Sequence, residues 1–149
     1  MSRSTTPIAL AALLAASITL PWTTASAAAR RTLTGTATAH LHLIKAEGSQ
    51  LIEEGPVSGT LTGAAHAKLH IGATFTANFT IRTHAGTLTG SGVAVPHGSG
   101  RYQSFSGSFL ATSGSGRYTH ISGRAGLYGV FDRRTDSAVI QTSGGKLTY

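Results

Sequence analysis

The sequence predicts an all-β protein, an eight-stranded antiparallel barrel, and three features of the chain support this. Polar and apolar residues alternate in several segments, as in a strand with one buried face. Glycine-rich turn sequences separate these segments, and the most distinctive, GSGRY, occurs at both Gly98–Tyr102 and Gly114–Tyr118. No segment after residue 30 has the apolar periodicity of a useful length of helix. The chain therefore reads as a series of short hairpins.

The N-terminal segment predicts a secretory signal peptide over residues 1–27 and hence a secreted, extracellular protein. Arg3 supplies the positive charge, Ile8–Leu20 an apolar run too short to span a membrane, and Ala25–Ala27 a cleavage site of small residues. No second long apolar run follows, so no membrane span is predicted. Residues 28–149 then form a single barrel domain, because about 120 residues suffice for one core and are too few for two.

Alternation and turn residues place the strands in order along the chain. Thr36–Leu43 carries alanine and leucine on one face and threonine and histidine on the other. His66–Ile71 alternates in the same way, and so does Ala73–Thr83, which adds the aromatic and β-branched residues that favour strands. The predicted strands are 31–46, 50–63, 65–71, 73–84, 87–95, 102–112, 118–131 and 136–148, with the seventh broken near Gly123–Gly126.

These strands share one apolar face, which the domain must hide against itself. A closed barrel and a two-sheet β-sandwich both achieve this. Closure removes exposed strand edges, and the recurring glycines permit the bends that a small barrel needs. We therefore favour the barrel, with the sandwich as the alternative.

The composition excludes several kinds of site. The chain has no cysteine, so it has no disulfide, thiolate nucleophile or thiolate metal site. Its net charge is +7, and removal of Arg3 with the signal peptide leaves +6. The basic residues are spread singly and are not interleaved with aromatic residues, which argues against nucleic acid as a partner. Anionic polymers of the cell envelope fit such a surface better.

The expected ligand site is the barrel interior. Glycine and alanine are frequent among the inward positions, so we expect an underfilled apolar lumen that binds a small apolar molecule. The alternative is a small barrel whose interior is fully packed. The residues expected to line the lumen are Phe75, Phe79, Ile81, Phe105, Phe109, Ile121, Leu127 and Phe131.

The segment from Gly86 onward resembles the barrels of allene oxide cyclases and plant dirigent proteins. Phe105-x-Gly-x-Phe109 followed by GSGRYTHISGRAGLYG is similar to the glycine-rich signature of that family. The matching positions are Gly114, Ser115, Gly116, Arg117, Tyr118, Gly123 and Gly126. The resemblance implies an eight-stranded barrel that holds a hydrophobic small molecule and guides its cyclisation or coupling by shape. It assigns no catalytic residue, because the cysteine near the allene oxide cyclase cavity has no counterpart here.

Two arginine-containing segments are candidates for binding an anionic group. Arg117 and Tyr118 occupy the same positions in the second GSGRY as Arg101 and Tyr102 in the first, where they either latch the turn or bind an anion or sugar. Residues 131–136 read as a hairpin connection with internal ion pairs. Its Arg133 and Arg134 would lie at the barrel mouth.

Among the acidic residues, Glu53 and Glu54 precede Gly55 and Pro56, and this tetrapeptide reads as a turn. No Ser/His/Asp order, phosphate-binding loop or paired-carboxylate motif is present, so no cofactor is predicted and catalytic residues stay unassigned.

Four histidines are the candidates for a metal site. His40 and His42 share one strand face and His66 and His70 another, so their rings would converge if the two strands were neighbours. Lys68 lies between the second pair and argues against a metal. We favour no metal site.

Two functions of different classes follow from the sequence. The leading hypothesis is a secreted barrel that binds a small apolar ligand and guides its cyclisation by shape. The competing hypothesis is a non-catalytic extracellular or cell-envelope protein that binds anionic polymers through a basic surface. A streptavidin-like binder is a third, weakened because the only tryptophan, Trp22, lies in the signal peptide.

Overall fold

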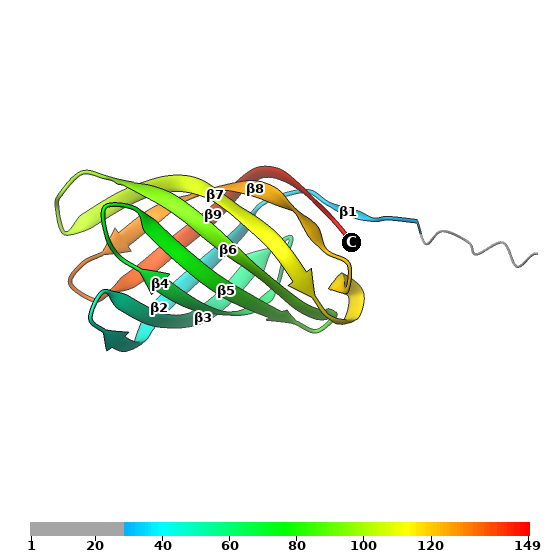
Figure 1. Ribbon diagram of the computed structural model, residues 1–149, viewed down its shortest axis with the longest axis horizontal. Helices are drawn as coiled ribbons and strands as arrows, with labels where there is room; N and C mark the ends of the chain where they lie inside the picture. Colours follow the sequence, from blue (N-terminus) through cyan, green and yellow to red (C-terminus); the bar gives the residue numbers. More distant parts are fainter. Residues whose placement is uncertain (1–28) are drawn as a thin grey trace, which may run out of the picture.

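In the computed structural model, which describes residues 29–149, the chain forms a closed barrel of eight antiparallel strands (Figure 1). The predicted signal peptide and Trp22 lie outside the described residues. The strands are β1 (Thr32–Leu33), β2 (Ala37–Glu47), β3 (Gln50–Gly59), β4 (Gly63–His70), β5 (Phe75–Thr83), β6 (Gly86–His97), β7 (Tyr102–Gly114), β8 (Ser122–Asp132) and β9 (Ser137–Thr148). No helix within residues 29–149 combines the length and the apolar character needed to cross a membrane.

The barrel closes through the pairing of its first long strand with its last. Each strand from β2 to β8 pairs with the next, and β9 pairs with β2 as well, from Thr38 opposite Gln141 to Leu41 opposite Ala138. The short β1 pairs with the final residues of β9. The predicted barrel is confirmed, and the sandwich alternative is wrong. Closure gives every long strand a partner on both sides, which removes open edges.

The connections between strands define two ends of the barrel, which we call the η1 end and the far end. The η1 end takes its name from a 3-10 helix, η1 (Gly116–Tyr118), and lies at the right in Figure 1, near the C-terminus. Its connections are residues 34–36, 60–62, 84–85 and 115–121. The far end holds the connections 48–49, 71–74, 98–101 and 133–136.

The predicted strands agree with the structure except at three places. The strand expected over 31–46 is divided into β1 and β2 by residues 34–36, where Gly35 has φ of +137°. The strand expected over 50–63 ends at Gly59, and the third difference lies at the second GSGRY.

The strand expected from residue 118 begins at Ser122, because η1 occupies residues 116–118. Gly116 has φ of +60°, and the Arg117 amide donates a 2.8 Å hydrogen bond to the carbonyl of Ala85. This contact holds η1 against the β5–β6 turn. The predicted interruption of the strand is a register shift between Ala125 and Gly126 in a continuous β8.

The prediction of a turn at Glu53–Pro56 is wrong, because these residues form the middle of β3. A Cβ on Gly55 would lie 1.7 Å from the carbonyl oxygen of His40, so only glycine allows β2 and β3 to approach here. Pro56 has no amide hydrogen to donate. The β2–β3 register skips this position, whereas β3 stays paired with β4 through Pro56 and Ala64. A missing donor is thus tolerated without ending the strand.

Phenylalanine side chains fill the far end of the lumen. The ring of Phe75 makes edge-to-face contacts with those of Phe105 and Phe131, at centroid distances of 5.9 and 5.8 Å. Phe105 lies opposite Gly129, where a Cβ would be 2.6 Å from the ring. Glycine on the neighbouring strand therefore makes room for the ring. This aromatic cluster is buried and closes the far side of the core.

Candidate functional site

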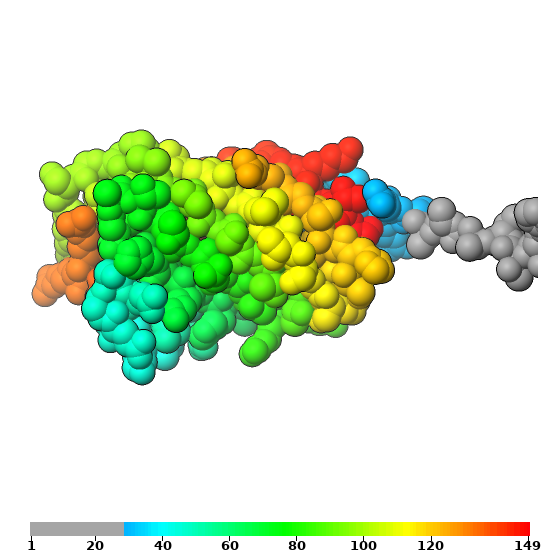
Figure 2. Space-filling view, in the orientation of Figure 1, coloured from blue at the N-terminus to red at the C-terminus, as the bar shows by residue number. Residues whose placement is uncertain are grey.

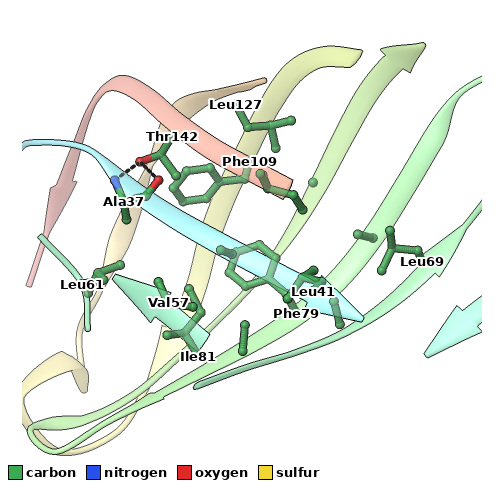
Figure 3. A pocket seen from close by; sticks show the side chains of 16 residues that line it. Ala37, Leu41, Val57, Leu61, Leu69, Phe79, Ile81, Phe109, Leu127 and Thr142 are labelled. Carbon is green, nitrogen blue, oxygen red and sulfur yellow. Dashed lines mark hydrogen bonds between the residues drawn. The ribbon is translucent and has the colours of Figure 1, made fainter. Parts of the chain in front are cut away.

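An apolar cavity of about 110 Å³ lies inside the barrel, and all eight long strands contribute to its wall (Figure 3). Its lining residues are Ala37, Ala39, Leu41, Val57, Leu61, Ala65, Ala67, Leu69, Ala77, Phe79, Ile81, Gly92, Phe109, Leu127, Ile140 and Thr142. Because every long strand contributes, the cavity belongs to the lumen and not to a surface groove.

Small residues create this space. Six of the lining residues are alanine or glycine, which leave room between the larger side chains. Phe79 and Phe109 meet edge to face with their ring centroids 5.7 Å apart, and both contribute to the cavity wall. Inward-pointing Ile81 and Leu127 are only partly covered by protein atoms, as expected for side chains beside a void. The interior on this side is therefore underfilled.

Thr142 is the one polar side chain in the lining. Its hydroxyl accepts a 2.8 Å hydrogen bond from the Ala37 amide and lies 3.4 Å from the Ala37 carbonyl, to which it donates (dashed in Figure 3). The hydroxyl thereby extends the seam between β2 and β9 by one position. These two bonds occupy the Thr142 hydroxyl. The cavity wall therefore interacts with a ligand through its shape and through apolar contacts, and it contains no charged side chain.

The structure places the predicted lining residues in three different environments. Phe79, Ile81, Phe109 and Leu127 line the cavity. The remaining phenylalanines, Phe75, Phe105 and Phe131, form the aromatic cluster at the far end and do not border it. Ile121 is buried at the η1 end, also outside the lining.

Glu53 and Gln103 are the two buried polar residues of 29–149 that the sequence reasoning missed, and Glu53 is the more deeply buried. Its side chain is fully buried, and neither carboxylate oxygen has a hydrogen-bond partner within residues 29–149. Burial, and secondarily the charge of Asp136, raise the pKa of Glu53 from 4.5 to about 7. Alternation with Leu51 and Val57 on the same strand was the signal that could have found it. Glu53 does not border the cavity, so it is not placed to act on a molecule bound there.

The anion-binding candidates lie at opposite ends of the barrel. Arg117 is exposed at the η1 end and donates a 2.8 Å hydrogen bond to the hydroxyl of Tyr149, whereas Tyr118 is buried. Arg133 and Arg134 belong to the β8–β9 connection at the far end. There Arg133 donates to the side-chain oxygen of Gln103 at 2.9 Å. The four residues therefore do not form one mouth.

Residues 131–136 do contain a hairpin connection, but its expected internal ion pair is wrong. Asp132 receives two hydrogen bonds from the Arg101 guanidinium, at 3.0 and 2.9 Å, so the ion pair joins the β8–β9 connection to the first GSGRY turn. These bonds, with a further one from the Arg134 amide, lower the pKa of Asp132 to about 2. Arg101 thus holds two far-end turns together.

The candidate metal ligands lie on strands that are not neighbours. β3 separates β2, with His40 and His42, from β4, with His66 and His70. Nδ1 of His66 instead lies 2.8 Å from a carboxylate oxygen of Glu54 on β3. Across residues 29–149 no three histidine or acidic side chains are grouped so that they would hold a metal ion.

Together these features define the class of protein: a closed eight-stranded antiparallel β-barrel with a small apolar cavity in its lumen. Comparisons of the chain with protein-family models, curated proteins and solved structures found no match. The likeness to allene oxide cyclase and dirigent barrels therefore stays a prediction from the glycine-rich motif.

Proposed function

We propose that the protein binds a small apolar molecule in the lumen of the barrel. The observation that carries this proposal is the cavity itself, enclosed by eight strands and lined by aliphatic and aromatic side chains. Native cores are packed so closely that few voids exceed a water molecule. A void of about 110 Å³ costs stability in the empty protein, and an apolar ligand that filled it would recover the lost contacts.

The cavity volume limits the ligand. An engineered apolar cavity of about 150 Å³ stays dry and binds benzene or xenon, whereas sites for drug-sized ligands are about 300–1,000 Å³. At about 110 Å³ the lumen suits a compact molecule close to benzene in size, or the end of an aliphatic chain. The resemblance to allene oxide cyclase and dirigent barrels implies a larger substrate. Such a substrate would fit only if the lining side chains moved.

The cavity wall favours binding over acid–base catalysis. No titratable side chain is among the lining residues, and the Thr142 hydroxyl is held by Ala37. General acid–base chemistry needs a titratable group within hydrogen-bond reach of the reacting atom. Guidance of a cyclisation would then rest on shape alone, and we propose it only in that form.

Small apolar probes test the proposal directly. Thermal unfolding of the purified protein is measured with and without benzene, and xenon binding is followed by the chemical shifts of the lining methyl groups. We expect benzene to raise the Tm, because a ligand that binds only the folded state stabilises it. We also expect xenon to shift the methyl resonances of Leu127 and Ile81.

A pair of β5 variants controls this experiment. Ala77→Leu fills the cavity, whereas Asn78→Leu adds a similar side chain to the exposed face of the same strand. We expect the first variant to lose the benzene and xenon responses and the second to keep them. An unchanged Tm of the original protein in benzene, or an equal response in the Ala77→Leu variant, would contradict the proposal. Native mass spectrometry of the protein from its own host would then identify the ligand.

A further inference from the structure

Charged side chains are distributed unevenly between the two ends of the barrel. Within residues 29–149, the η1 end carries six basic side chains and no acidic one. The six are Arg30, Arg31, Arg82, Arg117, Arg124 and Lys146. The rest of the barrel carries the other five basic residues and all five acidic residues of the chain. The net positive charge of the described chain therefore belongs to the η1 end.

The basic residues of the η1 end are exposed and lack acidic partners. The three ion pairs found within residues 29–149 are formed by residues outside this end. Arg124 and Lys146 are moreover direct partners in the β8–β9 register, so two like charges face each other on the outer surface. Like charges directly opposite each other in an antiparallel pair are destabilising. A bound anion would remove this repulsion.

A cleft of about 250 Å³ opens beside η1 at the same end. Its walls include Arg117, His84 and Tyr149, and no acidic side chain lines it. The Arg117 guanidinium lies over the Tyr149 ring at 5.3 Å and bonds the Tyr149 hydroxyl, which holds the cation at the cleft. Figure 2 shows the segment 115–121, coloured yellow to orange, at the outer surface of this end. The cleft thus offers a fixed guanidinium to an anionic group.

We propose that the η1 end is a docking surface for a linear phosphate polymer without nucleobases. The exposed tyrosines of residues 29–149, Tyr102 and Tyr128, lie outside the η1-end connections, so this surface has no aromatic platform on which bases would stack. Five of the six basic residues are arginines, whose planar guanidinium binds two phosphate oxygens at once. The basic residues stand on β5, β8 and β9, in η1 and before β1, so they are distributed around the rim. A chain that passes several of them gains more than one small anion at a single site. The proposal does not depend on a ligand in the lumen.

A polymer fits this surface better than a lipid bilayer does. Proteins that dock on bilayers place apolar side chains among the lipid headgroups. The exposed large apolar side chains of residues 29–149 lie within the long strands and not in the η1-end connections. In those connections Leu61, Tyr118 and Ile121 are buried, and the exposed residues are mostly threonine, serine and glycine.

The test measures binding of the purified protein to inorganic polyphosphate at several salt concentrations. Two variants lose the same amount of charge at different places: Arg124→Ala/Lys146→Ala at the η1 end, and Lys68→Ala/Arg134→Ala elsewhere. We expect binding that weakens steeply with salt, and a loss of about tenfold in affinity for the first variant only. Equal losses in the two variants, or no binding at low salt, would overturn the proposal.

A third variant separates a lost binding surface from a damaged fold. Lys146→Glu replaces the repulsive pair with an attractive one, so we expect a Tm equal to or above that of the original protein together with weaker polyphosphate binding. Retained affinity in this variant would count against the proposal. Phosphatidylglycerol vesicles and single-stranded DNA are measured in parallel. Tighter binding to either one would replace the polymer with a membrane or a nucleic acid as the partner.

Discussion

The two sides of the barrel interior are built from the same strands but are filled in opposite ways. Toward the far end, Phe75 packs edge to face against Phe105 and Phe131, and none of the three rings borders the cavity. Around the cavity, Phe79 and Phe109 are surrounded by alanines and Gly92, and a void of about 110 Å³ remains. We expect the cluster to contribute more stability, whereas the underfilled side holds the void that we propose as the ligand site. Variants matched across the two sides test this division.

The largest expected effect is the loss of a ring from the aromatic cluster. Phe131→Ala should destabilise the protein by about 3–5 kcal/mol, because a fully packed ring leaves a new cavity behind. Phe79→Ala should cost roughly half as much, since its ring already borders a void. Denaturant unfolding of both variants checks the difference. Equal losses would show that the two sides are equally well packed.

The second effect concerns Glu53, whose raised pKa makes stability depend on pH. The folded protein keeps this proton up to about pH 7, whereas the unfolded chain loses it near 4.5. The contribution of Glu53 is therefore most favourable below pH 4.5, falls as the pH rises to about 7, and is flat above. The total loss is on the order of 3 kcal/mol. In the Glu53→Gln variant, the free energy of unfolding should depend less on pH than in the original protein. At pH 8 the variant should be the more stable of the two. A parallel pH profile for the two proteins would contradict the assignment.

A smaller effect is expected at the seam beside the cavity. Thr142→Val keeps the shape of the side chain but removes the acceptor for the Ala37 amide, so we expect a loss of about 1–2 kcal/mol. Thr142→Ser, which keeps the hydroxyl, should lose less. Hydrogen exchange of the Ala37 amide is the specific measurement, and it should quicken only in the valine variant.

The final comparison adds methyl groups on each side, and its cavity variant has the smallest expected effect of all. Ala77→Val enters the cavity and should stabilise the protein by about 0.5 kcal/mol or leave it unchanged. Ala94→Val on β6, opposite Phe75, should cost about 1–3 kcal/mol because Ala94 is buried and its neighbours must move to admit the added methyl groups. Thermal unfolding of the two variants compares them. If Ala94→Val stabilised the protein, the aromatic cluster would also be underfilled, and the contrast between the two sides would be wrong.

Alternation was enough to predict most of the fold. Six of the eight long strands begin within about two residues of the expected positions, because each has one apolar face with a period of two. The exceptions are β2 and β8, which begin six and four residues later than expected. The same rule placed Phe79, Ile81, Phe109 and Leu127 on the inner surface. It could not tell which inward residues border a void, since this depends on the size of the residues that meet them from other strands.

The two GSGRY segments show where local sequence stopped being informative. In the first, Arg101 bonds Asp132 and Tyr102 is 62% exposed at the start of β7. In the second, the same letters form η1, and Tyr118 is buried against Tyr149. The difference arises from contacts distant in sequence, which a pentapeptide does not encode. Glu53 was missed for a related reason: the Gly-Pro pair suggested a turn, and its fit into β3 depends on β2 and β4.

The pairing of β1 with the end of β9 also makes the protein suitable for circular permutation. Arg31 and Tyr149 exchange two backbone hydrogen bonds, at 2.7 and 2.9 Å, so both ends of the described chain leave the barrel at one place. A short linker from Tyr149 to Arg31 would make the backbone circular without disturbing a strand. New termini in the 48–49 turn would then yield a permuted protein with the same order of strands around the barrel. The order of the strands along the chain could thus be changed while their order around the barrel stayed the same.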